Sequence, residues 1–389
     1  MGNTGERPES GDTTALGTRL RAARESAGVS LAALAARTHF SKSMLGSLET
    51  GQRQVRPEHI TAYSEALNIS VYALIAPPDD PVRIAHEWLV SDSVAVTHSA
   101  AGRRVGADLA GALEQRVIEL RHLDDSIGGR DLHPVVHKEL IDAQAVVLEA
   151  SYTERVGQRL LTAIGELSQL AGWVASDAGR YLDAQRIYLD GVSAATAAGY
   201  RALAGQLLSS LSYQIANVGN PADAALLART AVAGATNATP IVRTLLLERV
   251  AWANARARDH DATRRALDAV DDTYESRSPG IDEPEWVYWV NRTEIDVMAG
   301  RCFVELSDAP RAAPLLSRAI QNYPTGHARE VALYRTWLAE AYARSGDLDA
   351  ARANTERARR AAARVNSSRL DRRVSEVERM LESKRATWV

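Results

Sequence analysis

The first clear pattern in the chain is a pair of short apolar repeats at helical spacing, within residues 30–51. The first repeat places its apolar side chains on one face of a helix, and the second does so again a few residues later. The side chains concerned are Leu31, Leu34 and Ala35, then Leu45 and Leu48. The pattern predicts two short helices joined by a tight turn.

Residues that start and stop helices flank both repeats. Ser30 and Ser41 can each accept hydrogen bonds from the free backbone N–H groups at the start of a helix. Gly51 lies where a residue in the left-handed conformation would end the second helix. The apolar pairs that fit hydrophobic staples around the two starts are Val29 with Leu34 and Phe40 with Leu45.

Three prolines interrupt the helical pattern at residues 77–81. Such a segment cannot continue a helix and favours a stiff, extended connection, so we expect a domain boundary there. Beyond it, the pattern predicts an amphipathic helix from about Val82 and a longer helix over Gly106–Leu123, followed by a loop over Leu123–Pro134.

From Glu154 to about Val365, the chain repeats a unit of two helices. A small residue recurs near the start of each second helix, at Ala184, Ala224, Thr263, Ala312 and Ala351. One interval is about ten residues longer than the others, and the Pro- and Gly-rich segment 276–285 supplies that excess as a loop. Residues 104–150 would form a degenerate sixth pair. The amphipathic segment Arg369–Glu382 would cap the array or pair with a second subunit.

The segment Leu16–Ile75 resembles the Xre/Cro-type helix-turn-helix family. The matching residues are Arg19-Leu20-Arg21, Arg24, Gly28, Ser30-Leu31, Leu34-Ala35, Ser41, Leu45, Leu48-Glu49, Gly51 and Arg53. In that family the second helix of the pair lies in the DNA major groove. The resemblance implies a five-helix, lambda-repressor-like domain over residues 14–76. Its implied DNA-binding residues are Arg37, Ser41, Lys42, Ser43, Ser47 and Arg53.

Two residues depart from the family pattern. Leu31 lies where the family often has a glutamine bound to a phosphate. Gly46 falls inside the predicted recognition helix, where glycine costs about 1 kcal/mol relative to alanine.

The charge distribution agrees with a DNA-binding head. Residues 16–60 carry seven positive and three negative side chains, an excess of four positive charges, so the rest of the chain carries seven net negative charges. A basic segment attracts phosphate irrespective of base sequence. The alternative is that this helical bundle is a protein-interaction module, which would not need Lys42 and Ser43 on an exposed basic helix.

The helix pairs resemble tetratricopeptide (TPR) repeats, although the usual repeat is shorter, at about 34 residues. We therefore expect an all-α protein with a TPR-like α-solenoid over residues 82–389. In such arrays the first helix of each pair lines a concave face. The effector-binding residues that this spacing predicts are Gln169, Trp173, Asp177, Tyr213, Asn217, Glu248, Trp252, Arg256 and Arg301. For each aromatic residue, the alternative is packing against the neighbouring helix.

Composition limits where the protein works and what chemistry it performs. The 389-residue chain has a mean hydropathy of −0.23 and no apolar run long enough to cross a membrane. Residues 1–13 are polar, so we expect a disordered tail rather than a signal peptide. Cys302 is the single cysteine, which fits a reducing cytoplasm and a packing role. Asp124, Asp125 and His133 fit no metal-ligand spacing and are interpreted as capping and turn residues.

The whole arrangement resembles the cytoplasmic peptide-responsive regulators of Gram-positive bacteria. It is most similar to Xre-type regulators of actinomycetes, and abundant Ala and Arg with few Lys are typical of a high-GC genome. The resemblance implies a homodimer that binds a double-stranded DNA operator and a peptide or small-molecule effector. It also implies that Asn217 holds the backbone of a bound signal. No catalytic motif, cofactor site or metal site is expected. The alternative function is a TPR scaffold that docks a protein partner.

Overall fold

The computed structural model describes residues 10–67, 74, 80–90, 103–125, 129–323, 328–363 and 368–386. These residues are helical apart from turns, loops and one two-residue parallel pair, β1 (Arg103–Arg104) with β2 (Ala150–Ser151). The chain divides into two compact units. The first ends at Asp79, and the second contains nearly all of the chain from Asp80 onward.

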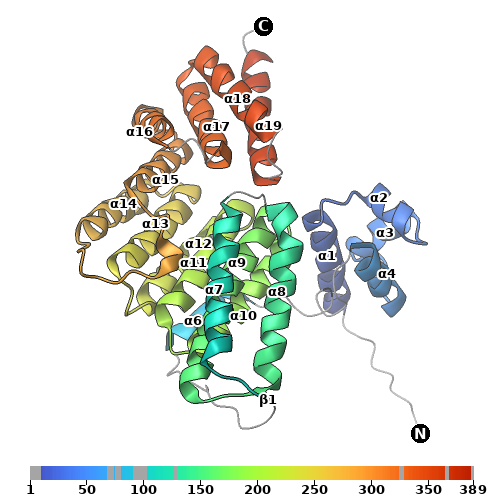
Figure 1. Cartoon of the computed structure of the whole chain (residues 1–389). Helices are drawn as coiled ribbons and strands as arrows, with labels where there is room; N and C mark the ends of the chain where they lie inside the picture. Colours follow the sequence, from blue (N-terminus) through green and yellow to red (C-terminus); the bar gives the residue numbers. More distant parts are fainter. Residues whose placement is uncertain are drawn as a thin grey trace. The chain divides into compact units, whose positions relative to one another are not determined.

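The first unit contains α1 (Ser10–Ser26), α2 (Leu31–Arg37), α3 (Lys42–Glu49) and α4 (Pro57–Leu67) (Figure 1). Helix α1 begins inside the predicted tail, of which residues 1–9 lie outside the described part. Of the predicted fifth helix, Leu74 is described as helical, and the residues on either side of it are not described. Likewise, residues 77–79 of the predicted proline-rich linker are not described.

The expected caps form at both short helices. Ser30 accepts a hydrogen bond from the Ala33 N–H at 3.1 Å, and Ser41 accepts one from the Met44 N–H at 3.2 Å. Gly51 has a φ of 72°, which is the left-handed conformation that ends α3. The apolar faces of these helices enclose one core, in which Leu20, Leu34, Leu45, Leu48 and Tyr63 are fully buried.

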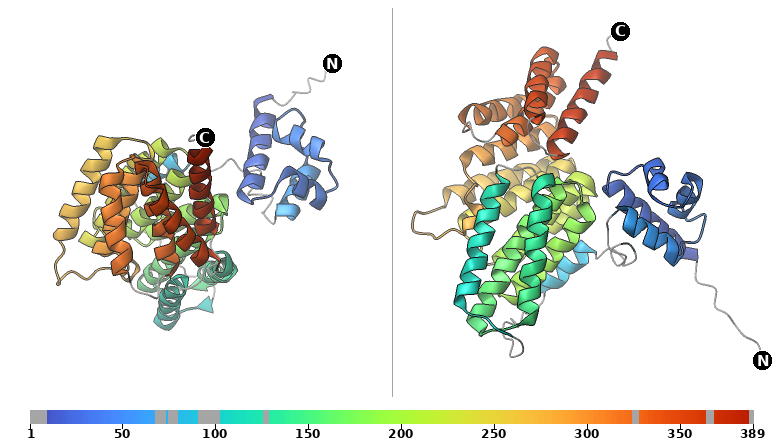
Figure 2. Two further views of the ribbon diagram at one scale, coloured as in Figure 1. Left: turned by 90° about the horizontal axis from the view of Figure 1, so that it is seen from above. Right: turned by 45° about the vertical axis from the view of Figure 1, so that its right-hand side comes forward.

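The second unit begins with α6 (Pro81–Val90) and continues with α7 (Ala107–Asp124) and α8 (Gly129–Glu149). Five antiparallel helix pairs follow. They are α9 (Glu154–Asp177) with α10 (Tyr181–Ala197), α11 (Arg201–Val218) with α12 (Pro221–Gly234), α13 (Pro240–Arg256) with α14 (His260–Glu275), α15 (Arg292–Glu305) with α16 (Ala309–Asn322), and α17 (Ala328–Ser345) with α18 (Leu348–Ala362). Helix α19 (Ser368–Ala386) packs against α17 and α18 (Figures 1 and 2).

The repeat pattern confirms the predicted α-solenoid. The predicted small residue is the fourth residue of the second helix in all five pairs, and each of the five is fully buried. The first pair also contains a close helix crossing at a glycine of its first helix. A Cβ added to Gly172 of α9 would lie 2.5 Å from the ring of Tyr188 on α10. Backbone and ring are therefore in direct contact where the two helices cross.

One expectation was wrong: the predicted loop Leu123–Pro134 is helical from Gly129 onward. Pro134 is the sixth residue of α8, so it lies inside the helix and removes one i→i−4 backbone hydrogen bond. Leu132, Val136 and Leu140 are spaced four residues apart on one face and are buried in the core, and this burial stabilises the helix.

Helix α19 closes the carboxyl-terminal end of the array. Its side chains Leu370, Val374, Val377 and Leu381 are buried within this subunit. These residues are the apolar stripe that the sequence predicts, so the stripe serves as a cap.

Candidate DNA-binding surface and ligand cavity

The amino-terminal end of α3 is exposed and polar. Ser41, Lys42 and Ser43 are exposed side by side at the start of the helix. Ser47 lies one turn further on, where its hydroxyl donates to the Ser43 carbonyl at 3.0 Å. Because the first turn of a recognition helix is the part that reaches base edges, Lys42 and Ser43 remain the predicted contacts.

Two arginines flank this helix. Arg37 ends α2 and is exposed, with one guanidinium nitrogen 3.4 Å from the Ala66 carbonyl. Arg53 is also exposed, and its backbone N–H donates to the Ser47 carbonyl at 3.0 Å, which fixes the turn after α3. Both guanidinium groups are therefore accessible to phosphate.

A buried ion pair holds α3 against α1. Arg24 donates from two nitrogens to the two carboxylate oxygens of Glu49, each at 2.7 Å, and from a third to the Val29 carbonyl. The Tyr63 hydroxyl donates to the same carboxylate at 2.9 Å. Arg24 and Glu49 are thus internal, but they cancel each other, so the positive excess of this unit is unchanged.

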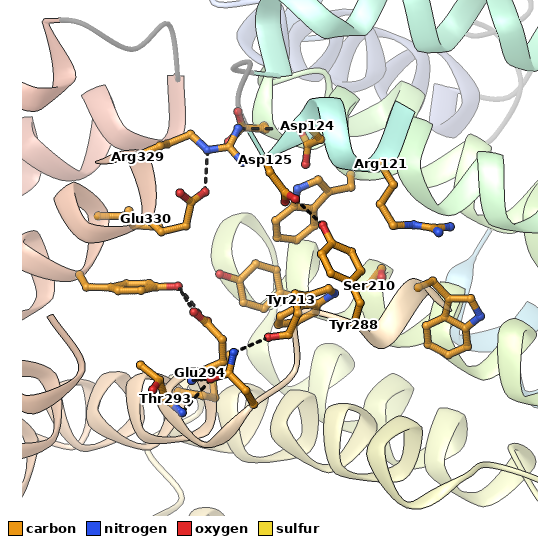
Figure 3. A pocket seen from close by; sticks show the side chains of 18 of the residues that line it. Arg121, Asp124, Asp125, Ser210, Tyr213, Tyr288, Thr293, Glu294, Arg329 and Glu330 are labelled. Atoms are coloured by element: carbon orange, nitrogen blue, oxygen red, sulfur yellow. Dashed lines mark hydrogen bonds and ion pairs between the residues drawn. The ribbon is translucent and has the colours of Figure 1, made fainter. Parts of the chain in front are cut away.

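The second unit contains a cavity of about 780 Å³. First helices of the repeats contribute much of its lining, together with the carboxyl end of α7 and the segment around the short helix η1 (Glu285–Val287) (Figure 3). The lining is rich in aromatic rings and in charged side chains of both signs. A partly apolar cavity with converging polar groups is the usual form of a small-ligand site.

Five of the nine predicted effector-binding residues line this cavity: Gln169, Trp173, Asp177, Tyr213 and Arg301. Gln169 lies with its amide nitrogen 3.4 Å from the Ser210 hydroxyl. Arg301 donates to the Tyr213 hydroxyl at 2.7 Å, and its guanidinium also lies 4.4 Å from the Trp252 ring.

The other four predicted effector-binding residues do not line the cavity. Each is either buried or bonded to another group of the second unit. Trp252 is fully buried between Tyr213 and Trp337, at ring distances of 6.1 and 5.4 Å. Glu248 is buried as well. Asn217 donates to the carbonyl of Tyr213, one helical turn back, at 2.7 Å. Arg256 pairs with Glu305 at 2.9 Å. Trp252 therefore packs against neighbouring helices, which is the alternative that the sequence left open for each aromatic residue.

Several lining residues were missed by the sequence analysis. Trp286, Tyr288 and Trp289 follow the long loop and line the cavity. A cluster of three aromatics in four residues was the signal that could have identified them. Asp124 and Asp125, interpreted from sequence as turn residues, also line the cavity. The Tyr288 hydroxyl donates to Asp125 at 2.5 Å.

The described residues include no group of three or more His, Cys, Asp or Glu side chains that could hold a metal ion. Cys302 is fully buried, and burial raises the pKa of its thiol well above the usual range. No described helix is long and apolar enough to cross a membrane.

Comparison with known families identifies the first unit. Residues 15–71 match a family model described as a helix-turn-helix domain. This match, together with the capped and exposed α3, confirms the helix-turn-helix domain that the sequence predicts. The whole sequence matches no curated protein.

Among solved structures, the chain is similar to Bacillus thuringiensis PlcR in complex with the peptide PapR7 and DNA, at 10% identity and a TM-score of 0.34, covering 96% of this chain and 98% of that one. It is also similar to the apo competence regulator ComR of Streptococcus vestibularis, at 11% identity and a TM-score of 0.33, covering 81% and 95%. A third similar structure is that of a point mutant of PrgX, at 9% identity and a TM-score of 0.33, covering 85% and 95%. TM-scores this low establish neither a shared fold nor a shared ligand.

Proposed function

We propose that this protein is a transcriptional regulator that binds a specific DNA operator as a homodimer. We further propose that an effector, either a peptide or a small molecule, binds in the cavity of the second unit and changes operator affinity. The observation that carries the proposal is the combination, in one chain, of a helix-turn-helix domain with a large aromatic cavity in a separate helical-repeat unit.

The homodimer follows from the size of the reading surface. One recognition helix reads only a few base pairs, and two related by a two-fold axis reach successive major grooves about 34 Å apart. Sedimentation of the chain with and without operator DNA tests this part. A complex with one chain per operator would contradict it.

Coupling between the cavity and DNA binding follows from the form of the second unit. Each repeat contacts mainly its neighbours, so small rotations per repeat add up along the array. The cavity lining extends from α7 to α19, so a ligand there can contact several repeats at once. An effector shifts the equilibrium only if it binds one conformation better than the other. A coupling of about 1–3 kcal/mol would change operator affinity about 5- to 150-fold.

The experiment compares operator binding with and without an extract of the native host, for the unmodified protein and two variants. Tyr288→Ala removes a half-exposed ring from the cavity wall and should abolish the effect of the extract. Ile281→Ala, in the same connection between α14 and α15 but outside the lining, is the matched control and should keep the effect. Trp252→Ala is unsuitable, because removing a fully buried tryptophan costs about 3–5 kcal/mol of stability.

If no extract, from any growth phase, changes operator binding of the unmodified protein, the effector proposal fails. The second unit would then be better explained as a scaffold for dimerisation or for docking a protein partner.

A further inference from the structure

Negative charge is concentrated at one end of the cavity. Four carboxylates lie there, from Asp124, Asp125, Asp177 and Glu330, and we call this group the acidic end. The guanidinium of Arg329 lies among them, 2.9 Å from Glu330 and 3.8 Å from Asp124 (Figure 3). Among the residues that the structure describes at this end, carboxylates thus outnumber guanidinium groups.

Helix dipoles add to this negative charge. Helix α7 ends at Asp124 with Asp125 as its cap, and α9 ends at Asp177. The carboxyl end of a helix carries a partial negative charge, so an acidic side chain there is unfavourable and a cation is favourable. The two carboxylates at the end of α7 therefore favour a cationic ligand. Asp177 differs from them, because it also accepts a hydrogen bond at 3.1 Å from the Gly129 N–H at the start of α8.

The acidic end also shows signs of uncompensated charge. Burial raises the pKa of Asp124 to about 7, and Asp177, Asp125 and Glu330 act in the same direction against Arg329. One carboxylate oxygen of Glu330 is buried without a hydrogen-bond partner among the described groups. A further cation at this end would stabilise the ionised carboxylates.

The other arginines that line the cavity interact with groups outside the acidic end. Arg121 pairs with Glu166 at 3.0 Å and with Glu285, and neither carboxylate lines the cavity. Arg292 pairs in the same way with Asp271 at 2.6 Å and Asp296 at 2.7 Å. The two remaining arginines lie over aromatic rings: Arg249 is 4.6 Å from the Tyr213 ring, and Arg301 is 5.0 Å from the Trp337 ring.

Aromatic walls next to the acidic end suit an organic cation. Tyr288 contacts Asp125 directly through its hydroxyl, and Trp173 and Trp289 also line the cavity. Aromatic faces attract ammonium groups and also bury apolar surface. A bare metal ion is not favoured, because the described residues contain no suitable group of ligands.

We propose that the acidic end binds the primary ammonium group of an organic ligand whose apolar or aromatic body lies against these walls. This inference rests on the proposed effector-binding function and names the chemical class of the effector. Two sources carry this chemistry: a small-molecule amine, and the free amino terminus of a short peptide.

The test uses matched probes that share one aromatic body. Binding of 2-phenylethylamine, 2-phenylethanol and 3-phenylpropionate to the full-length protein is measured by calorimetry near neutral pH. Charge-assisted hydrogen bonds to a buried carboxylate should make the amine bind at least about tenfold tighter than the alcohol. The carboxylate probe should bind weakest. The tripeptide Phe-Leu-Phe, with a free or an acetylated amino terminus, tests the peptide source in the same way.

Two variants link any preference to the acidic end. Asp125→Asn removes one negative charge and keeps an oxygen that can accept from Tyr288, so the ratio of amine to alcohol affinity should fall about tenfold. Asp282→Asn is the matched control, because Asp282 is exposed and lies outside the lining. The control should keep the full ratio.

A preference for the amine over the alcohol that is lost in Asp125→Asn supports a small-molecule amine as the effector. A preference seen only for the free tripeptide over the acetylated one, and lost in the same variant, supports a peptide. Equal binding of amine and alcohol, preference for the carboxylate, or no binding by any probe would each overturn the proposal. Operator binding measured with host extract distinguishes a wrong ligand class from a wrong proposed function. If the extract changes operator affinity while the amine preference is absent, the ligand class is wrong and the proposed function stands.

Discussion

Single side chains on α3 are expected to set how the protein contacts DNA. Lys42 and Ser43 are exposed at the start of the helix, and nothing in the first unit's core depends on them. Their replacement can therefore change DNA binding without changing the fold.

If Lys42 contacts a phosphate, Lys42→Ala should weaken binding to all sequences and reduce the slope of log affinity against log salt by about one unit. Ser43→Ala should relax preference at one base position. Fluorescence anisotropy over a range of salt concentrations measures both. Lys138→Ala, an exposed lysine of α8, is the control. If neither Lys42→Ala nor Ser43→Ala alters binding, α3 is not the recognition helix.

Glu248 is expected to make stability depend on pH. Burial raises the pKa of this carboxyl from 4.5 to about 8. Because the folded state holds the proton more tightly than the unfolded state, stability falls as pH rises through that interval. Glu248→Gln removes this titration, so it should raise the free energy of unfolding at about pH 8 by at least about 1 kcal/mol.

Melting temperatures between about pH 5 and pH 8 test this prediction, with exposed Glu275→Gln as the control. The Glu248→Gln protein should show the flatter profile. Some slope should remain, because burial also raises the pKa of Asp124 and Glu294. If the melting temperatures of the two proteins depend on pH in the same way, ionisation of Glu248 does not lower the stability of the fold.

At the scale of helices, the ion pair between Arg24 and Glu49 is expected to hold α3 on α1. Removing one partner of a buried pair costs about 3–5 kcal/mol, so Arg24→Ala should greatly accelerate amide hydrogen exchange over residues 16–67. Arg21 on the same helix pairs with Glu25 on the surface and is the matched control. Similar exchange in both variants would mean that the buried pair does not hold the helix in place.

The crossing of α9 and α10 gives a second test at this scale. Gly172→Ala would place a methyl group 2.5 to 2.8 Å from ring atoms of Tyr188. Crowding of this kind costs about 1–3 kcal/mol, against a gain of up to about 1 kcal/mol in helix propensity, so a net loss of stability is expected. Gly280→Ala, which meets no atom within 4 Å, is the control. A higher melting temperature for Gly172→Ala would contradict the close crossing.

Helices and repeats were predictable because their signals are local. Caps at Ser30 and Ser41 and the recurring buried small residue identified the elements and their pairing. The cavity was harder to predict, because its lining depends on contacts between distant segments. Trp252 has the spacing of a concave-face residue, yet Arg301 and Trp337 from later repeats cover it. Asp124 and Tyr288, far apart in sequence, both line the cavity.

For the whole molecule, regulation by an effector requires that the cavity and the operator-binding surface influence each other. Coupling free energy is reciprocal: if a ligand changes operator affinity by some factor, the operator must change ligand affinity by the same factor. This relation holds whichever class of effector binds and whichever direction the effect takes.

The most direct test begins with a ligand that remains bound when the protein is purified from its own host. The ligand is identified by native mass spectrometry, and its dissociation constant is measured by calorimetry with and without saturating operator. Reciprocal coupling predicts that the two dissociation constants differ by about 5- to 150-fold, and by the same factor as the operator affinities measured with and without ligand. Equal ligand affinity in the presence and absence of operator would contradict it.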